Sequence, residues 1–127
     1  MRRSEGYIAL LAVLITGAAA MAIAVMLLTT GTDAQRSALI SQQSIQARQL
    51  AHACVEEALQ KIHDSTSYTG TGTGTLGAGS CAYTVTSTGA TTRTVATTGT
   101  VNSVVRKVTA YATISSSTIS ITSWQEV

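Results

Sequence analysis

The stretch GYIALLAVLITGAAAMAIAVMLL at residues 6–28 decides the fold of this chain of 127 residues. It contains no charged residue and no proline, and after Gly6 its one glycine is Gly17. As an α-helix, the part after Gly6 would extend ~33 Å, enough to cross a hydrocarbon core of ~30 Å. One segment alone can satisfy its backbone in lipid only as a helix. The sequence therefore predicts a transmembrane helix at residues 7–28.

The residues before this stretch are few and basic. Arg2 and Arg3 precede the single acidic residue Glu5. Basic residues beside a membrane segment favour the cytoplasmic side. We therefore expect a single-pass protein of the cytoplasmic membrane, with its N-terminus inside and everything after Leu28 exported. Roughly 100 residues follow, which is room for one small domain.

The exported part has little apolar mass to bury. It is rich in Thr, Ser and Gly, and the chain has no Phe, no Pro and one Trp. Such a domain needs a covalent staple. The chain carries a net charge of +2, and without residues 2–5 the exported part is close to neutral. Near-neutrality favours self-association over electrostatic steering.

The two cysteines, Cys54 and Cys81, both lie on the exported side. An even count in an oxidising compartment favours a disulfide between them. Closing a loop of about 28 residues would stabilise the fold by roughly 3.6 kcal/mol at most. Two reduced cysteines are the alternative. A metal pair is disfavoured, since neither cysteine has a second ligand at close spacing.

Three interpretations of the N-terminus remain open. A cleaved signal peptide would use Ala18-Ala19-Ala20 as its small-x-small site, but the apolar run continues through Met26. An uncleaved signal anchor fits the length. The third interpretation uses the sequence on both sides of the span.

The leader RRSEG at residues 2–6 and the start YIALL at residues 7–11 resemble the class III signal of type IV pilins and pseudopilins. The resemblance implies that a prepilin peptidase cuts after Gly6 and that the new terminus, Tyr7, is N-methylated. In that family the fifth mature residue is usually Glu, whereas here it is Leu11. Some minor pilins and tip pseudopilins also lack this Glu. The resemblance therefore favours a minor or divergent subunit.

The same resemblance implies partners for the apolar helix. It would contact membrane lipid before assembly and other pilin subunits in an extracellular filament, with an assembly platform acting on it. The residues expected to form this assembly and membrane surface are Tyr7, Ile8, Leu10, Leu11, Leu14, Ile15 and Gly17.

Residues 29–64 are expected to form an amphipathic exported helix. Thr29-Thr30-Gly31-Thr32 weakens helix formation, either as the polar edge of the span or as a place where the helix bends or melts. From Asp33 onward helix formers dominate. An apolar stripe with steps of three and four follows, flanked by Leu50, Val55 and Leu59. The stripe consists of Ala47, Ala51, Cys54, Ala58 and Ile62.

Residues 65–80, STSYTGTGTGTLGAGS, are interpreted as a Gly/Thr-rich loop. The glycines look superficially like a phosphate cradle. A P-loop needs a Lys after its last glycine and a strand before it, and here there is no Lys and a helix precedes.

From Cys81 to Val127 a period of two predicts an antiparallel β-sheet head. One face of each predicted strand is apolar and the other is rich in Thr, so the first would pack on the helix and the second would face water. Gly99 is expected to be a weak spot or bulge in the second strand. The inward positions are Cys81, Tyr83 and Val85, then Arg93, Val95, Thr97 and Val101, then Val104, Val108, Ala110, Ala112 and Ile114, and finally Ile119 and Ile121 in a short fourth strand at 118–124. The predicted fold is α+β, a long N-terminal helix packed against a meander of three to four strands.

No arrangement of residues points to catalysis, a metal or a cofactor. His52 and His63 are eleven residues apart, too far to share a ligand. If its strand is regular, Arg106 shares a face with buried residues and needs a partner, for which Glu57 is the candidate. A solvated edge position is the alternative. A basic patch of Arg93, Arg106 and Lys107 for DNA is a minor possibility.

We therefore expect a structural subunit of a type IV pilus-like filament and not an enzyme. The alternative is a single-pass, signal-anchored surface protein that presents a small β-rich binding head.

Overall fold

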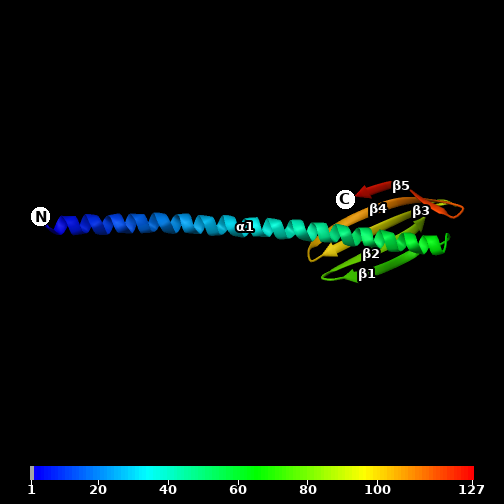
Figure 1. Cartoon of the computed structure of the whole chain (residues 1–127), viewed down its shortest axis with the longest axis horizontal. Coiled ribbons are helices and arrows are strands. Elements are labelled where there is room, and N and C mark those ends of the chain that lie inside the picture. Colours follow the sequence, from blue (N-terminus) through cyan, green and yellow to red (C-terminus); the bar gives the residue numbers. More distant parts are fainter. Residues whose placement is uncertain (1) are drawn as a thin grey trace. The chain divides into compact units, whose positions relative to one another are not determined.

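A computed structural model describes residues 2–127, with side chains from Ser4 onward (Figure 1). One helix, α1 (Arg2–Asp64), precedes five strands: β1 (Gly70–Leu76), β2 (Gly79–Ser87), β3 (Thr92–Val101), β4 (Val104–Ser115) and β5 (Thr118–Glu126). The chain divides into two compact units, Met1–Leu39 and Ile40–Val127. From Arg2 onward the first is helix alone, and the second contains the rest of α1 and the whole sheet.

The helix is unbroken at residues 29–32. The sequence had allowed either the polar edge of the membrane segment there or a place where the helix bends or unfolds locally. The hydroxyl groups of Thr29 and Thr30 donate to the carbonyl oxygen of Met26, at 2.9 and 2.6 Å. Thr32 donates in the same way to the Thr29 carbonyl at 2.8 Å. These hydroxyl groups bond back to the preceding turn and therefore need no other partner, which suits a helix that leaves a membrane.

The strands form one antiparallel sheet in the order β1-β2-β3-β4-β5, so each strand pairs with its neighbour in sequence. The predicted α+β class and meander are confirmed, but the sheet has five strands and not three to four. Tight turns join the strands. Gly77, Asn102 and Ser116 adopt positive φ angles of 61°, 53° and 55° there. Such angles match the turns whose twist suits a hairpin.

The interpretation of residues 65–80 as a loop is wrong. The sheet begins at Gly70, and β1 pairs with β2 along the segment GTGTGTL. Gly72 pairs with Tyr83, and a Cβ atom on Gly72 would overlap the Tyr83 ring. The glycines of β1 thus leave room for the large side chain of the next strand. Because these glycines have no side chain, the segment shows no alternation of apolar and polar residues, and the sequence therefore did not indicate a strand.

The core lies between the second half of α1 and one face of the sheet (Figure 1). Every residue of the predicted helix stripe is at most 1% exposed, so that prediction is confirmed. Leu50 and Val55 are buried too, and Leu59 is partly buried. The predicted inward faces of β2, β3 and β4 are also confirmed. Their buried members are Cys81, Tyr83, Val85, Arg93, Val95, Thr97, Val101, Val108, Ala110, Ala112 and Ile114.

Gly99 is not a bulge. The register continues regularly through it, with Cys81 on one side and Arg106 on the other. A Cβ atom there would overlap the Ala47 carbonyl oxygen and lie 2.8 Å from the Ala51 nitrogen. Gly99 is therefore where the backbone of α1 comes closest to the sheet, which only glycine permits at this distance.

The irregularity in the sheet lies between β4 and β5. Tyr111 pairs with Ser123, and the next residue, Ala112, pairs with Ile121. Thr122 is the extra residue, and its hydroxyl group donates to the Tyr111 carbonyl at 3.1 Å. The bulge changes which side chains of β5 face α1. Ile119 is half-buried, whereas Ile121 remains 47% exposed.

Candidate functional site

The first candidate surface is the apolar part of α1. Its predicted assembly residues are all exposed, from 46% for Leu11 to 71% for Leu14. No neighbouring atom lies where Gly6 or Gly17 would carry a Cβ. Within the described residues, α1 is the one helix long and apolar enough to span a membrane, with a mean hydropathy of 2.6 over its most apolar window. By length and composition this helix is suited to serve as a membrane anchor.

The proposed processing point lies within α1. Gly6 and Tyr7 are both helical and exposed. The ring of Tyr7 is 68% exposed, next to the similarly exposed Ile8. Cleavage and N-methylation at these residues remain predictions.

The predicted disulfide is present between Cys54 on α1 and Cys81 on β2, with Cα atoms 6.2 Å apart. Both residues are buried, Cys54 in the helix stripe and Cys81 on the inner face of the sheet. The bond lies against β1, because a Cβ on Gly74 would be 3.4 Å from the Cys81 sulfur. It joins the helix covalently to the middle of a small core.

The predicted ion pair between Glu57 and Arg106 is wrong. Arg106 is exposed, and its Nε donates to the Ser44 hydroxyl group at 2.9 Å. Glu57 lies instead beside β1, with a carboxylate oxygen 3.9 Å from the Cβ position of Gly74. The pattern placed Arg106 on the inner face of β4. On that face Val104 is half-buried and Val108 is buried, but Arg106 between them is exposed, and its side chain extends to Ser44 on α1.

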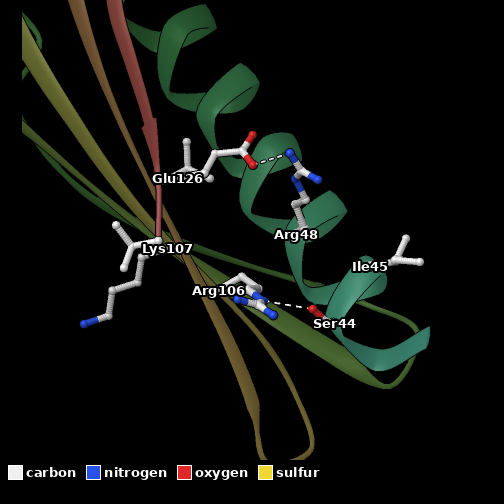
Figure 2. A pocket seen from close by; sticks show the side chains of 8 residues that line it. Ser44, Ile45, Arg48, Arg106, Lys107 and Glu126 are labelled. Carbon is white, nitrogen blue, oxygen red and sulfur yellow. Dashed lines mark hydrogen bonds and ion pairs between the residues drawn. The ribbon is translucent and has the colours of Figure 1, made fainter. Parts of the chain in front are cut away.

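The three basic residues considered for DNA do not form one patch. Arg93 is 6% exposed, and its guanidinium donates to the carbonyl oxygens of Thr66 at 2.8 Å and Gly89 at 3.1 Å. It ties the turn after β2 to the segment that follows α1. Figure 2 shows the Lys107 side chain pointing away from that of Arg106.

A cluster centred on Glu126 was missed by the sequence analysis. Its carboxylate forms an ion pair with Arg48 and accepts hydrogen bonds from His52 Nε2 at 2.9 Å and Trp124 Nε1 at 3.1 Å. The His52 and Trp124 rings meet edge to face, with centroids 5.0 Å apart. The Trp124 hydrogen bond, followed by those from Arg48 and His52, lowers the pKa of the Glu126 carboxyl group. This cluster fastens the end of β5 to α1.

No signal in the sequence indicated this cluster. The spacing of Arg48 and His52 is that of one helical turn, but their partner is 74 residues beyond His52. The register that brings Glu126 to them depends on the bulge at Thr122.

A buried phenol, that of Tyr83, lies under β1. Burial first, and then a hydrogen bond with Tyr68 and the charge of Glu57, raise the pKa of Tyr83 to about 12. The Tyr83 ring is 3% exposed and covers Gly72. This phenol stays protonated and packs, and it offers no general base near neutral pH.

A cavity of about 310 Å³ opens beside the Glu126 cluster, between α1 and the ends of β4 and β5 (Figure 2). Ser44, Ile45 and Arg48 line it from the helix, and Arg106, Lys107 and Glu126 from the sheet. It is the place where charged side chains of α1 and the sheet gather. Among residues 2–127, no group of three or more His, Cys, Asp or Glu side chains could hold a metal ion.

Comparison with known proteins adds no relative. No protein-family model, no curated protein and no solved structure matches the chain significantly. The architecture alone, a long apolar N-terminal helix with a small antiparallel sheet, agrees with that of pilin-like proteins.

Proposed function

We propose that this chain is a structural subunit of a type IV pilus-like filament, processed after Gly6 and assembled through its apolar N-terminal helix. One observation carries the proposal. The exposed apolar stretch of α1 continues without a break into a helix whose other half is bonded by a disulfide to a small β-sheet. A subunit of this kind needs a helix that packs and a head that stays attached to it.

The physical basis is that one surface serves two environments. In a membrane, lipid chains cover the apolar side chains of residues 7–28 and keep them out of water, so no protein partner is needed. In a filament in water, the same side chains would be exposed unless neighbouring helices cover them. Extraction from the membrane is therefore coupled to packing against other subunits, and no active site in this chain is required.

The proposal includes partners and a route. A prepilin peptidase acts on the cytoplasmic side after Gly6, an assembly platform draws the subunit out of the cytoplasmic membrane, and the filament is extracellular. Leu11 stands at the fifth mature position, where the resemblance leads us to expect Glu. We therefore assign the chain to a minor or divergent subunit.

Intact-mass spectrometry of the protein from its native host tests this proposal, with the sample kept unreduced. We expect a chain that begins at Tyr7 and carries one additional methyl group. Reduction should then add two hydrogens, which reports the Cys54–Cys81 bond. The matched control is a Gly6→Leu variant, which should keep its leader and remain in the membrane fraction.

Other masses would point elsewhere. An uncleaved chain that retains Arg2 and Arg3 would favour the alternative, a single-pass anchor that presents the β-rich head for binding. A chain that begins after Ala20 would be a secreted head without an anchor. Either result would overturn the filament proposal.

A further inference from the structure

The cavity beside Glu126 contains an arginine whose hydrogen-bonding capacity is mostly unused. Arg106 donates through Nε to Ser44 at 2.9 Å. Its two terminal nitrogens have no partner among the side chains that the structure describes, from Ser4 onward. A guanidinium presents five N–H donors in a planar fork, and a carboxylate matches that fork with two parallel hydrogen bonds. The Ser44 contact holds the fork at the cavity while leaving its outer edge free (Figure 2).

The charge around the cavity also favours an anion. Arg48, Arg106 and Lys107 all line it, and the one side-chain carboxylate there, Glu126, already accepts from three donors. Arg106 therefore has no ion pair among the described residues. The cavity, at about 310 Å³, is large enough to admit the end of an acidic side chain.

The acidic residues of the chain narrow the choice of occupant. Asp64 accepts from Gln60 at 3.0 Å, and Glu57 lies beside β1. Besides Glu5 in the proposed leader, the exposed carboxylates with no hydrogen bond or ion pair among the described residues are Asp33, Glu56 and Glu57. Asp33 follows the apolar stretch by five residues, whereas Glu56 and Glu57 lie on the half of α1 that carries the sheet.

We propose that the Arg106 cavity receives the Asp33 carboxylate of a neighbouring copy of this chain. The inference rests on the proposed function, because packing through residues 7–28 brings the segment just beyond them next to other copies. Arg36 lies three residues after Asp33 and so on the same side of the helix. The neighbour thus presents one carboxylate and one guanidinium to a cavity that holds the free guanidinium of Arg106 and the carboxylate of Glu126.

Cross-linking in filaments isolated from the native host tests the contact. Two singly substituted chains, Asp33→Cys and Arg106→Cys, are co-expressed and treated with a short bis-maleimide. A cross-linked dimer is expected from the mixture and from neither chain alone. The matched control replaces Asp33→Cys by Glu56→Cys, at another exposed carboxylate without a partner, and is expected to give no dimer with Arg106→Cys.

Charge reversal supplies a second readout that a folding defect would not reproduce. Asp33→Arg alone and Arg106→Asp alone should each lose incorporation into filaments. The two changes in one chain should restore it, because the pair is re-formed with opposite signs. Arg106 is exposed and outside the core, so its replacement leaves the sheet folded.

The outcomes separate this inference from the proposed function. If the unaltered chain is found in filaments but the dimer and the rescue are both absent, the cavity contact is overturned and the filament proposal stands. A dimer formed through Glu56→Cys would also overturn it. If the unaltered chain enters no filament, both proposals fall together.

Discussion

At the scale of single residues, glycines that carry no side chain determine how closely the elements of this protein pack. Gly99 lets the backbone of α1 approach β3, and Gly72 leaves space for the Tyr83 ring. At the other extreme, the Glu126 carboxylate gathers three donors from two elements. Both features depend on contacts between residues far apart in sequence.

Replacement of Gly99 by Ala should destabilise the head. The new methyl group would overlap the Ala47 carbonyl oxygen, and two backbone segments must separate to admit it. Overpacking of this kind costs about 1–3 kcal/mol. Thermal unfolding of the full chain in detergent measures the effect. Gly74→Ala is the matched control, since its Cβ would make only ordinary contacts of 3.4 Å or more, and it should change Tm much less.

Stability should fall on acidification because of Glu126. Its pKa is lower in the folded chain than the ordinary value of 4.5. The stabilising contribution is therefore fully present above about pH 5 and is lost as the pH falls through the folded-state value. Tm measured from pH 6 to pH 3 should decline more steeply in the unaltered chain than in Glu126→Gln. An equally steep decline in that variant would contradict the assignment, and Glu56→Gln, which removes an unpartnered carboxylate, should leave the profile unchanged.

At the scale of elements, the second half of α1 and the sheet form one small core that a disulfide crosses. Three of the seven buried residues of the helix are alanines, so the helix lies close to the sheet but buries little apolar surface at those positions. Small cores of this kind depend on covalent staples. The bond joins α1 to β2, and β1 lies directly over it.

Reduction should therefore lower the stability of the head substantially. The chain-entropy relation gives roughly 3.6 kcal/mol for a loop of about 28 residues as an upper value. Tm measured with and without reductant should differ by many degrees in the unaltered chain. In the double variant Cys54→Ser, Cys81→Ser, reductant should have no effect, and its Tm should match that of the reduced chain. Equal stability of oxidised and reduced chains would show that the bond does not support the core.

At the scale of the whole molecule, the chain combines an exposed apolar helical unit with a packed unit. The first unit has no core of its own, since its apolar side chains are exposed along its length. Such a surface persists in water only if lipid or other protein covers it. The function of the whole molecule therefore depends on whether lipid or other protein covers residues 7–28.

A charge placed in the apolar stretch should prevent stable membrane anchoring. Leu14→Arg introduces a guanidinium near the middle of the span, which costs ~2.5–3.5 kcal/mol in membrane insertion. The fraction of the chain that resists carbonate extraction should fall accordingly. Leu39→Arg, at an exposed apolar position outside residues 7–28, is the matched control and should remain in the membrane fraction. If both variants are retained equally, the stretch is not the anchor.

The sequence alone predicted the elements whose residues repeat with a visible period. The stripe of Ala47 to Ile62 and the alternation in β2, β3 and β4 were read correctly, because apolar side chains must face one core. The same reasoning failed for β1. Glycine has no side chain to mark an inward face, so a strand of alternating Gly and Thr resembles a loop.

Tertiary structure alone decided the candidate site. Arg106 pairs with Gly99, where the backbone of α1 lies closest to the sheet, and its side chain contacts Ser44 of the helix and not Glu57. Glu126 reaches Arg48 and His52 because one extra residue, Thr122, resets the register of β5. Local periodicity carries information about which face of an element is buried. It carries none about which residue of a distant element lies opposite, since that depends on bulges, turn geometry and the closest approach permitted at Gly99.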